Sequence, residues 1–243
     1  MRTFVYAHRG ANRRAPENTL RAFALAIEEG ADGVELDVRT CADGTVVVAH
    51  DPHLGRVGER AAWIAMLPWE RVRAVRLGDG ERVPLLDEAI DLVVGAGLRL
   101  NVEVKSDVPD RGATVRAVAA ALSRRSAAER EAIVLSSFDP RILRALRAAL
   151  RGVPIGYLFD LEHPGPLRAA MLERALRPDG LHPHFSLCSP RAIRRWRARG
   201  LFVNAWTVND PGRALELAGA GIDAIITDDV PRVRAALGLA RGR

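Results

Sequence analysis

Short runs of apolar and β-branched residues alternate along this chain with longer amphipathic stretches that are rich in alanine and arginine. Such an alternation is typical of a parallel sheet, because each helix returns the chain to the end at which the next strand begins. The expected strands are Thr3–Ala7, Gly33–Val38, Arg99–Val104, Ala132–Ser136, Val153–Leu158, Gly180–His182, Leu201–Trp206 and Asp223–Thr227. The expected helices include Thr19–Glu29, Leu85–Val94, Arg111–Arg124, Pro140–Leu150, Pro190–Arg199 and Pro211–Ala218. Eight strands in 243 residues predict an α/β fold, a (β/α)8 barrel, for which about 250 residues are typical.

Several of the expected helices begin with a recognisable start signal. A capping side chain stands directly before a proline at Asp139-Pro140, Ser189-Pro190 and Asp210-Pro211. Proline is favoured at the first position of a helix, because its missing N–H has no partner there in any case. These three dipeptides therefore locate helix starts after the strands that precede them.

One segment interrupts the alternation. Thr45–Ala49 follows the second strand through Ala42-Asp43-Gly44, which is typical of a hairpin turn, so we expect an antiparallel extension of that strand. Residues from about 51 to 84 then form an insertion within a single domain that spans 1–243. The insertion contains Trp63 and Trp69, and it either caps the barrel mouth or packs its own aromatic side chains at the surface.

The composition excludes several classes of protein. A hydrophobic fraction of 48% predicts a folded core. The net charge is +6, but the arginines are scattered among acids and aromatic residues make up only 5%, so nucleic-acid binding is not expected. Cys41 and Cys188 lack the spacing of a zinc site and are expected to be free thiols. No signal peptide or membrane-spanning run is visible, which predicts a cytoplasmic protein without stable membrane association.

Three acidic residues are expected to point into the barrel. Glu35 and Asp37 alternate with valines and a leucine in the second strand, so both carboxylates lie on one face, and Glu103 lies on the neighbouring strand. Buried carboxylates are costly unless positive charge neutralises them. A hard divalent cation does so with oxygen ligands. The alternative is an ion-pair network with arginines, and we favour the metal because inward-facing acids cluster at functional sites.

Lys105 is the only lysine among the 36 basic residues of the chain. It follows the third strand and shares a face with Glu103. An ammonium is a compact point charge suited to a phosphate, whereas the guanidinium of arginine is a planar fork. This setting predicts a binding role, although an arginine-rich composition must also leave its rare lysine somewhere.

Two histidines stand where strands end at the expected mouth. His8 ends the first strand and is followed by Arg9, and His50 follows the hairpin strand. Imidazole titrates near neutrality and serves as a general acid or base, while the arginine offers a fork for phosphate. Either histidine alone would more often be structural. Together with three acids and a lysine, the pair predicts a catalytic site.

Four further residues are weaker candidates for substrate binding. Glu17 precedes the first helix, where it serves either the helix terminus or the site. His182 ends the sixth strand and either lines the pocket or packs beneath it. Trp206, at the mouth of the seventh strand, and Phe138 could form an apolar wall, or could belong to the core.

The ordered set of motifs resembles the glycerophosphodiester phosphodiesterase family along nearly the whole chain. The matching motifs are His8-Arg9-Gly10, Pro16-Glu17-Asn18-Thr19, Glu35-Leu36-Asp37-Val38, Asp43-Gly44 with His50-Asp51, Glu103-Val104-Lys105, Ser136-Ser137-Phe138 and Trp206-Thr207-Val208-Asn209. Cys41 stands where a polar residue is common, and the arginine-rich stretch 55–77 matches the family only loosely, which leaves substrate preference open.

The resemblance implies a TIM barrel of the phospholipase-C-like phosphodiesterase type, with an insertion after its second strand. It implies Mg²⁺ or Ca²⁺ bound by Glu35, Asp37 and Glu103, with His8 and His50 as acid and base. By the same resemblance, Arg9 and Lys105 match phosphate-binding positions. The implied reaction is hydrolysis of a small-molecule glycerophosphodiester to sn-glycerol 3-phosphate and an alcohol.

Several alternatives stay open at this point. The nucleophile is either water or the substrate's own glycerol hydroxyl, and either histidine can be the base. A related enzyme would act on lysophospholipids in the manner of a lysophospholipase D. A protein of another class would use the barrel and its arginines only to bind anions. The sequence does not determine the oligomeric state.

Overall fold

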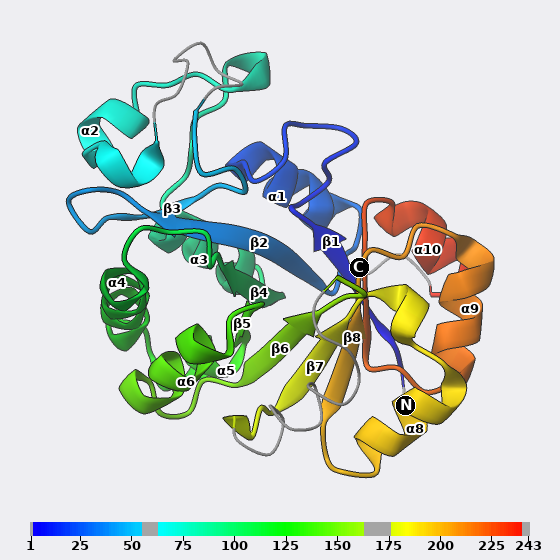
Figure 1. The fold of residues 1–243 in the computed structure, drawn as a ribbon. Helices are drawn as coiled ribbons and strands as arrows, with labels where there is room; N and C mark the ends of the chain where they lie inside the picture. The colour runs from blue at the N-terminus through cyan, green and yellow to red at the C-terminus, as the bar shows by residue number, and fades with distance from the viewer. Residues whose placement is uncertain (1, 55–62, 163–175, 240–243) are drawn as a thin grey trace.

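The computed structural model describes residues 2–54, 63–162 and 176–239. Its nine-stranded sheet has the order β1-β9-β8-β7-β6-β5-β4-β2-β3, and a further β1–β2 pairing closes eight parallel strands into a barrel. The barrel strands are β1 (Phe4–His8), β2 (Gly33–Thr40), β4 (Arg99–Val104), β5 (Ile133–Ser137), β6 (Ile155–Phe159), β7 (Gly180–Pro183), β8 (Phe202–Ala205) and β9 (Ala224–Thr227). The predicted (β/α)8 barrel is therefore confirmed, and Figure 1 shows its strands surrounded by helices.

Six of the described helices that surround the barrel begin close to the predicted positions. They are α1 (Leu20–Glu28), α3 (Leu86–Gly95), α4 (Arg111–Ser123), α6 (Pro140–Ala149), α8 (Pro190–Arg197) and α9 (Pro211–Gly219). The short helices α5 (Ala127–Glu131) and α10 (Val230–Ala236) were not predicted. Asp139, Ser189 and Asp210 each accept a hydrogen bond from a backbone N–H of the first turn, as their position before a proline predicted. The predicted helix Thr19–Glu29 starts one residue later, because Thr19 is itself the cap.

The alternation along β2 decides which side chains face the barrel interior. Val34, Leu36 and Val38 belong to the main apolar core together with Phe23 of α1 and Ile90 of α3. The intervening residues of the strand are charged, so they lie on the opposite face, toward the barrel axis. Every residue of β2 is buried, so its acidic side chains need partners within the barrel.

The insertion forms a small apolar cluster of its own beside the hairpin. The strand β3 (Val46–Val48) runs antiparallel to β2, as predicted, after a turn in which Gly44 has a φ of 84°. The described parts of the insertion include the 3-10 turns η2 (Ile64–Met66) and η3 (Gly78–Gly80) and the helix α2 (Trp69–Val72). Figure 1 shows α2 beside β3, outside the ring of barrel helices. Residues 55–62 of the insertion lie outside the described residues.

The two tryptophans of the insertion differ in their surroundings. Trp63 is 42% exposed and meets the ring of His53 edge-on, whereas Trp69 packs against the apolar cluster of the insertion. This cluster contains Cys41, Val47, Leu54, Ile64, Val72, Val75 and Val83. The described parts of the insertion thus pack apolar side chains against the β2–β3 hairpin. The two hypotheses for the insertion, a cap over the barrel mouth or a surface segment that packs its own aromatic side chains, both stay predictions. Within the described part of the chain, no helix combines the length and apolarity needed to cross a membrane.

Candidate active site

A cavity of about 320 Å³ opens where the carboxyl ends of the barrel strands meet. Its lining comes mostly from strand ends and from the loops that follow them, which is the edge at which barrels of this type bind ligands. The lining residues are His8, Arg9, Glu35, His50, Asn101, Glu103, Lys105, Phe138, Leu158, Trp206, Thr207 and Ile226. Most of the predicted site residues therefore lie around one space.

Three carboxylates come together beside this cavity, and two of them, Glu35 and Glu103, line it. Asp37 of β2 lies opposite Glu103 of β4 in the sheet register, and Glu35 lies two residues earlier on the same face. One oxygen from each group lies within 4.8 Å of the others, and all three residues are buried. Oxygen donors at this separation suit a hard cation such as Mg²⁺ or Ca²⁺. The three residues form a cluster that can hold a divalent cation.

The pKa values of the three acids differ with their partners. Burial, and then repulsion from Asp37, raises the pKa of Glu35 to about 8. Burial and the same neighbour raise the pKa of Glu103. Burial would also raise the pKa of Asp37, but Lys105 and Arg9 outweigh it and hold the pKa below its usual range.

The predicted ion-pair alternative accounts for only part of the cluster. Among the described residues, Glu35 has no arginine or lysine side chain within ion-pair distance. Its carboxylate accepts a hydrogen bond from the backbone N–H of Arg9 at 3.2 Å and lies 4.0 Å from His8 Nε2. A further positive charge would stabilise the ionised form of this buried carboxylate. The donor set therefore fits a cation in addition to the ion pairs.

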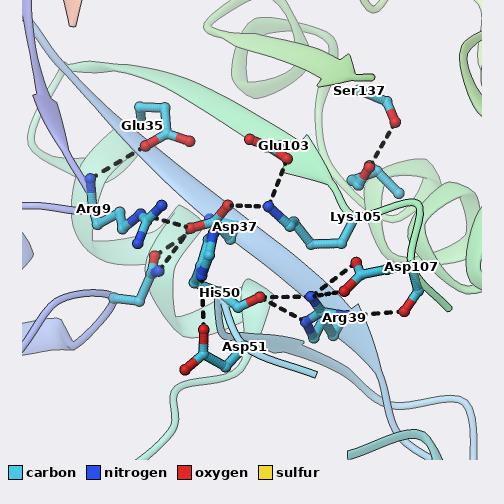
Figure 2. A network of polar contacts seen from close by, with 12 residues as sticks. Arg9, Glu35, Asp37, Arg39, His50, Asp51, Glu103, Lys105, Asp107 and Ser137 are labelled. Carbon is cyan, nitrogen blue, oxygen red and sulfur yellow. Dashed lines mark hydrogen bonds and ion pairs between the residues drawn. The ribbon is translucent and has the colours of Figure 1, made fainter. Parts of the chain in front are cut away.

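Two basic side chains cross-link the acids, as Figure 2 shows. Lys105 Nζ lies 2.8 Å from a Glu103 oxygen and 3.3 Å from Asp37 Oδ1. Arg9 Nε lies 3.1 Å from Asp37 Oδ2, and its Nη1 lies 3.2 Å from Glu17. Arg9 has a φ of 57°, in the left-handed region that non-glycine residues rarely adopt. The surrounding structure thus holds this arginine in a strained conformation that aims it at the acids.

The two predicted histidines lie on the same cavity, and a different aspartate holds each ring. His8 Nδ1 lies 2.6 Å from Asp228 Oδ1, and His50 Nδ1 lies 2.9 Å from Asp51 Oδ1. For His8, burial would lower the pKa, but the hydrogen bond to Asp228 and the charge of Glu35 raise it. For His50, burial prevails and lowers the pKa.

Of the four weaker candidates for substrate binding, two line the cavity and two do not. Phe138 and Trp206 both line the cavity and meet edge-on, with ring centroids 5.5 Å apart. Glu17 contacts Arg9, while Thr19, two residues later, caps the helix. His182 is fully buried, and its Nδ1 has no hydrogen-bond partner among the described residues. Its backbone oxygen accepts a hydrogen bond from Trp206 Nε1 at 2.7 Å, so this histidine lies behind the cavity wall.

Sequence reasoning missed three residues that hold the site together. Asp228 holds His8, and Asn18 donates a hydrogen bond of 2.9 Å to Asp37. The third is Arg39, whose Nε and Nη2 both donate to the backbone oxygen of His50 and which also pairs with Asp107. A signal existed for Arg39, because it continues the inward-facing positions of β2 two residues beyond Asp37. Asp228 had a weaker one, since it directly follows the last strand.

Comparison with known proteins decides the family. The model of the glycerophosphoryl diester phosphodiesterase family matches residues 8–232, from the first histidine of the site to the last helix. The chain belongs to this family. The resemblance found in the motifs is thereby confirmed, and so is the class of enzyme, a phosphodiesterase.

Relatives of this phosphodiesterase match it along nearly their whole length. A glycerophosphodiester phosphodiesterase of Caldanaerobacter subterraneus subsp. tengcongensis is 31% identical over 94% of this chain and 95% of its own. The crystal structure of a putative glycerophosphoryl diester phosphodiesterase from Silicibacter pomeroyi has a TM-score of 0.87 and 28% identity, over 99% of this chain and 95% of the other. An Oleispira antarctica phosphodiesterase, solved in complex with the product sn-glycerol-3-phosphate, has a TM-score of 0.87 and 29% identity, over 97% and 96% of the two chains.

Proposed function

We propose that this phosphodiesterase hydrolyses glycerophosphodiesters to sn-glycerol 3-phosphate and an alcohol, with a divalent cation held by Glu35, Asp37 and Glu103. One observation supports this most strongly. A single cavity of about 320 Å³ gathers acids that can hold a cation, basic groups for a phosphate and two histidines. The product in the Oleispira antarctica structure adds support from a relative of similar fold.

The acids supply only oxygen donors, which favours Mg²⁺ or Ca²⁺ over metals that prefer nitrogen or sulfur. When bound, such a cation polarises a non-bridging phosphoryl oxygen and stabilises the charge that develops there. Lys105 keeps two of the three carboxylates oriented, since its ammonium contacts both Glu103 and Asp37. Asn18 fixes the remaining oxygen of Asp37.

Arg9 and Lys105 are proposed to bind the phosphoryl group. Both side chains line the cavity, and each keeps N–H groups beyond those that contact the acids. Positive groups fixed before the substrate arrives stabilise developing charge without reorganising during the reaction. Glu17 limits the freedom of the Arg9 guanidinium and so has a positioning role.

His8 and His50 are proposed to transfer the protons. In each ring Nδ1 is engaged by an aspartate, so Nε2 remains for exchange with the substrate. One histidine removes a proton from the nucleophile, and the other protonates the departing alkoxide. Asp228 and Asp51 are positioning residues in this scheme, because they set the tautomer and the orientation of each ring.

The apolar wall formed by Trp206 and Phe138 is proposed to face the glycerol portion of the substrate. Their edge-to-face packing gives a rigid surface beside the polar groups, as in most small-molecule sites. His182 is proposed to support this wall from behind, since its backbone oxygen holds the indole of Trp206.

The test is a direct assay of the purified protein with glycerophosphocholine and other glycerophosphodiesters. We expect release of sn-glycerol 3-phosphate with Mg²⁺ or Ca²⁺ and none after exhaustive chelation with EDTA. Release of the alternative product pair, a phosphorylated alcohol and glycerol, would contradict the proposal. So would a complete lack of hydrolysis of these diesters with either metal.

A further inference from the structure

A second cavity, of about 350 Å³, adjoins the candidate active site and is not used in the mechanism proposed above. It lies between the loop before α1, the end of β3 and the insertion. The described residues that line it are Asn12, Pro16, Glu17, Asn18, Val48, Ala49, His50, Asp51, His53, Leu54, Ile64, Leu77, Gly78 and Val83. Among these residues, His50 also lines the first cavity, so this residue borders both spaces.

The two cavities differ in the charge of their walls. The first contains the basic side chains of Arg9 and Lys105. The described lining of the second contains no arginine or lysine, although the chain has 36 basic residues and a net charge of +6. Its carboxylates are Glu17, which also contacts Arg9, and Asp51, which also holds the ring of His50. A described lining with two carboxylates and no arginine or lysine, in so basic a chain, disfavours an anion and favours a cation.

The second cavity also has a large apolar wall. Val48, Leu54, Ile64, Leu77 and Val83 line it, and four of these five side chains are buried in the core or in the cluster of the insertion. Apolar walls with a few acidic groups suit a ligand with methyl or methylene groups around a positive charge. The volume lies near the lower end of the roughly 300–1,000 Å³ usual for small-molecule pockets. A compact head group fits this space better than a long acyl chain.

The position of His50 connects this cavity with the reaction. A phosphoryl group bound by Arg9 and Lys105 lies in the first cavity, and a leaving oxygen that His50 contacts lies at the boundary with the second. The rest of the alcohol then extends past the imidazole. We propose that the second cavity receives the departing alcohol and selects a head group with positive charge on a carbon framework, such as a quaternary ammonium alcohol. This proposal rests on the function proposed above.

The first arm of the test uses the wild-type enzyme and matched substrates. Glycerophosphocholine is compared with its uncharged isostere, the 3,3-dimethylbutyl diester, and with an anionic diester of 3-hydroxypropanoate. We expect kcat/KM for the uncharged diester to be about tenfold lower than for glycerophosphocholine, equivalent to about 1.4 kcal/mol. The value for the anionic diester should be lower still. Equal values for all three, or a preference for the anionic diester, would overturn the proposed charge selectivity.

The second arm narrows the cavity at Leu77, which is only half-buried and so tolerates replacement better than a core residue. Leu77→Trp should raise KM for glycerophosphocholine about tenfold. Hydrolysis of the methyl diester should be unchanged, because this substrate has no head group to accommodate. Inhibition by sn-glycerol 3-phosphate should also be unchanged, because this product occupies the first cavity. Leu77→Arg should reverse the order of the choline and anionic diesters. Leu215→Trp, on the exposed face of α9, is the matched control.

The outcomes separate this inference from the proposed function. If the wild-type enzyme hydrolyses the methyl diester but Leu77→Trp affects all diesters equally, or none, the second cavity is not the head-group site and the proposed function stands. If the wild-type enzyme hydrolyses none of the diesters, the proposed function itself fails.

Discussion

His8 Nδ1 lies 2.6 Å from Asp228 Oδ1, although 220 positions separate the two residues in the chain. The carboxylate is held in turn by the side-chain amides of Asn12 and Asn209, each at 2.6 Å. Burial alone would raise the pKa of Asp228, but these hydrogen bonds lower it well below its usual range. An ionised carboxylate at this distance favours a proton on Nδ1 and turns Nε2 toward the cavity.

We therefore expect Asp228→Asn to lower kcat by at least about tenfold with little change in KM, because the ring loses its preferred tautomer and not its contacts with substrate. The pH profile of kcat/KM should shift as well, which loss of a purely structural contact would not cause. Asp229→Asn is the matched control, since that neighbouring residue caps α10 and should affect the melting temperature more than kcat. Unchanged kcat and pH profile in Asp228→Asn would remove Asp228 from the site.

Replacing either histidine should affect turnover more strongly than replacing the aspartate. His8→Ala and His50→Ala should each reduce kcat by roughly 10²–10⁴-fold, the usual contribution of a general acid or base. Steady-state assays with glycerophosphocholine measure the effect. Near-wild-type activity in both variants would refute the proposed proton transfers.

Lys105→Arg should lower turnover at least about tenfold despite conserving the charge. The ammonium sits between Glu103 and Asp37 with a side chain only 13% exposed, and a planar guanidinium cannot contact both oxygens in the same space. The matched control is Arg144→Lys on the exposed face of α6, the reverse exchange at a solvated position. Equal activity of Lys105→Arg and the wild type would show that a positive charge alone suffices here.

Metal binding can be measured without activity. Mg²⁺ or Ca²⁺ should raise the melting temperature of the wild type in proportion to RT ln(1 + [L]/Kd), since a ligand that binds only the folded state stabilises it. Glu103→Gln and Glu35→Gln should abolish most of that shift. A shift that survives in both variants would place the cation elsewhere.

His182 should make the folded state sensitive to acid. Burial lowers its pKa from 6.5 to about 3, so below pH 6.5 the unfolded chain binds a proton that the folded protein does not. Stability is therefore lost as pH falls, by about 1.4 kcal/mol between pH 7.5 and 5.5. Denaturant unfolding of the wild type and of His182→Gln at both values measures this. An identical pH dependence in the two proteins would show that His182 does not titrate in this way.

The local periodicity of the sequence was sufficient to predict most of the helices and strands and the residues at the centre of the site. The two-residue repeat of β2 predicted that Glu35 and Asp37 face the barrel interior, and capping residues before prolines predicted helix starts. Boundaries shifted by one or two residues where neighbours intervened. For example, β6 begins at Ile155 rather than Val153, because Pro154 has no N–H for the sheet. The short helices α5 and α10 were not predicted, since each has too few residues for a clear period.

The sequence by itself determined the barrel, the inward-facing acids and the histidines at strand ends, because each depends on the spacing of residues within one segment. Only the tertiary structure decided the contacts between distant segments. Pairing of β1 with β9 brings Asp228 to His8, and packing of the insertion against the loop before α1 creates the second cavity. Barrel closure and loop packing sum many weak contacts across the whole chain, so no local pattern records which side chains they bring together.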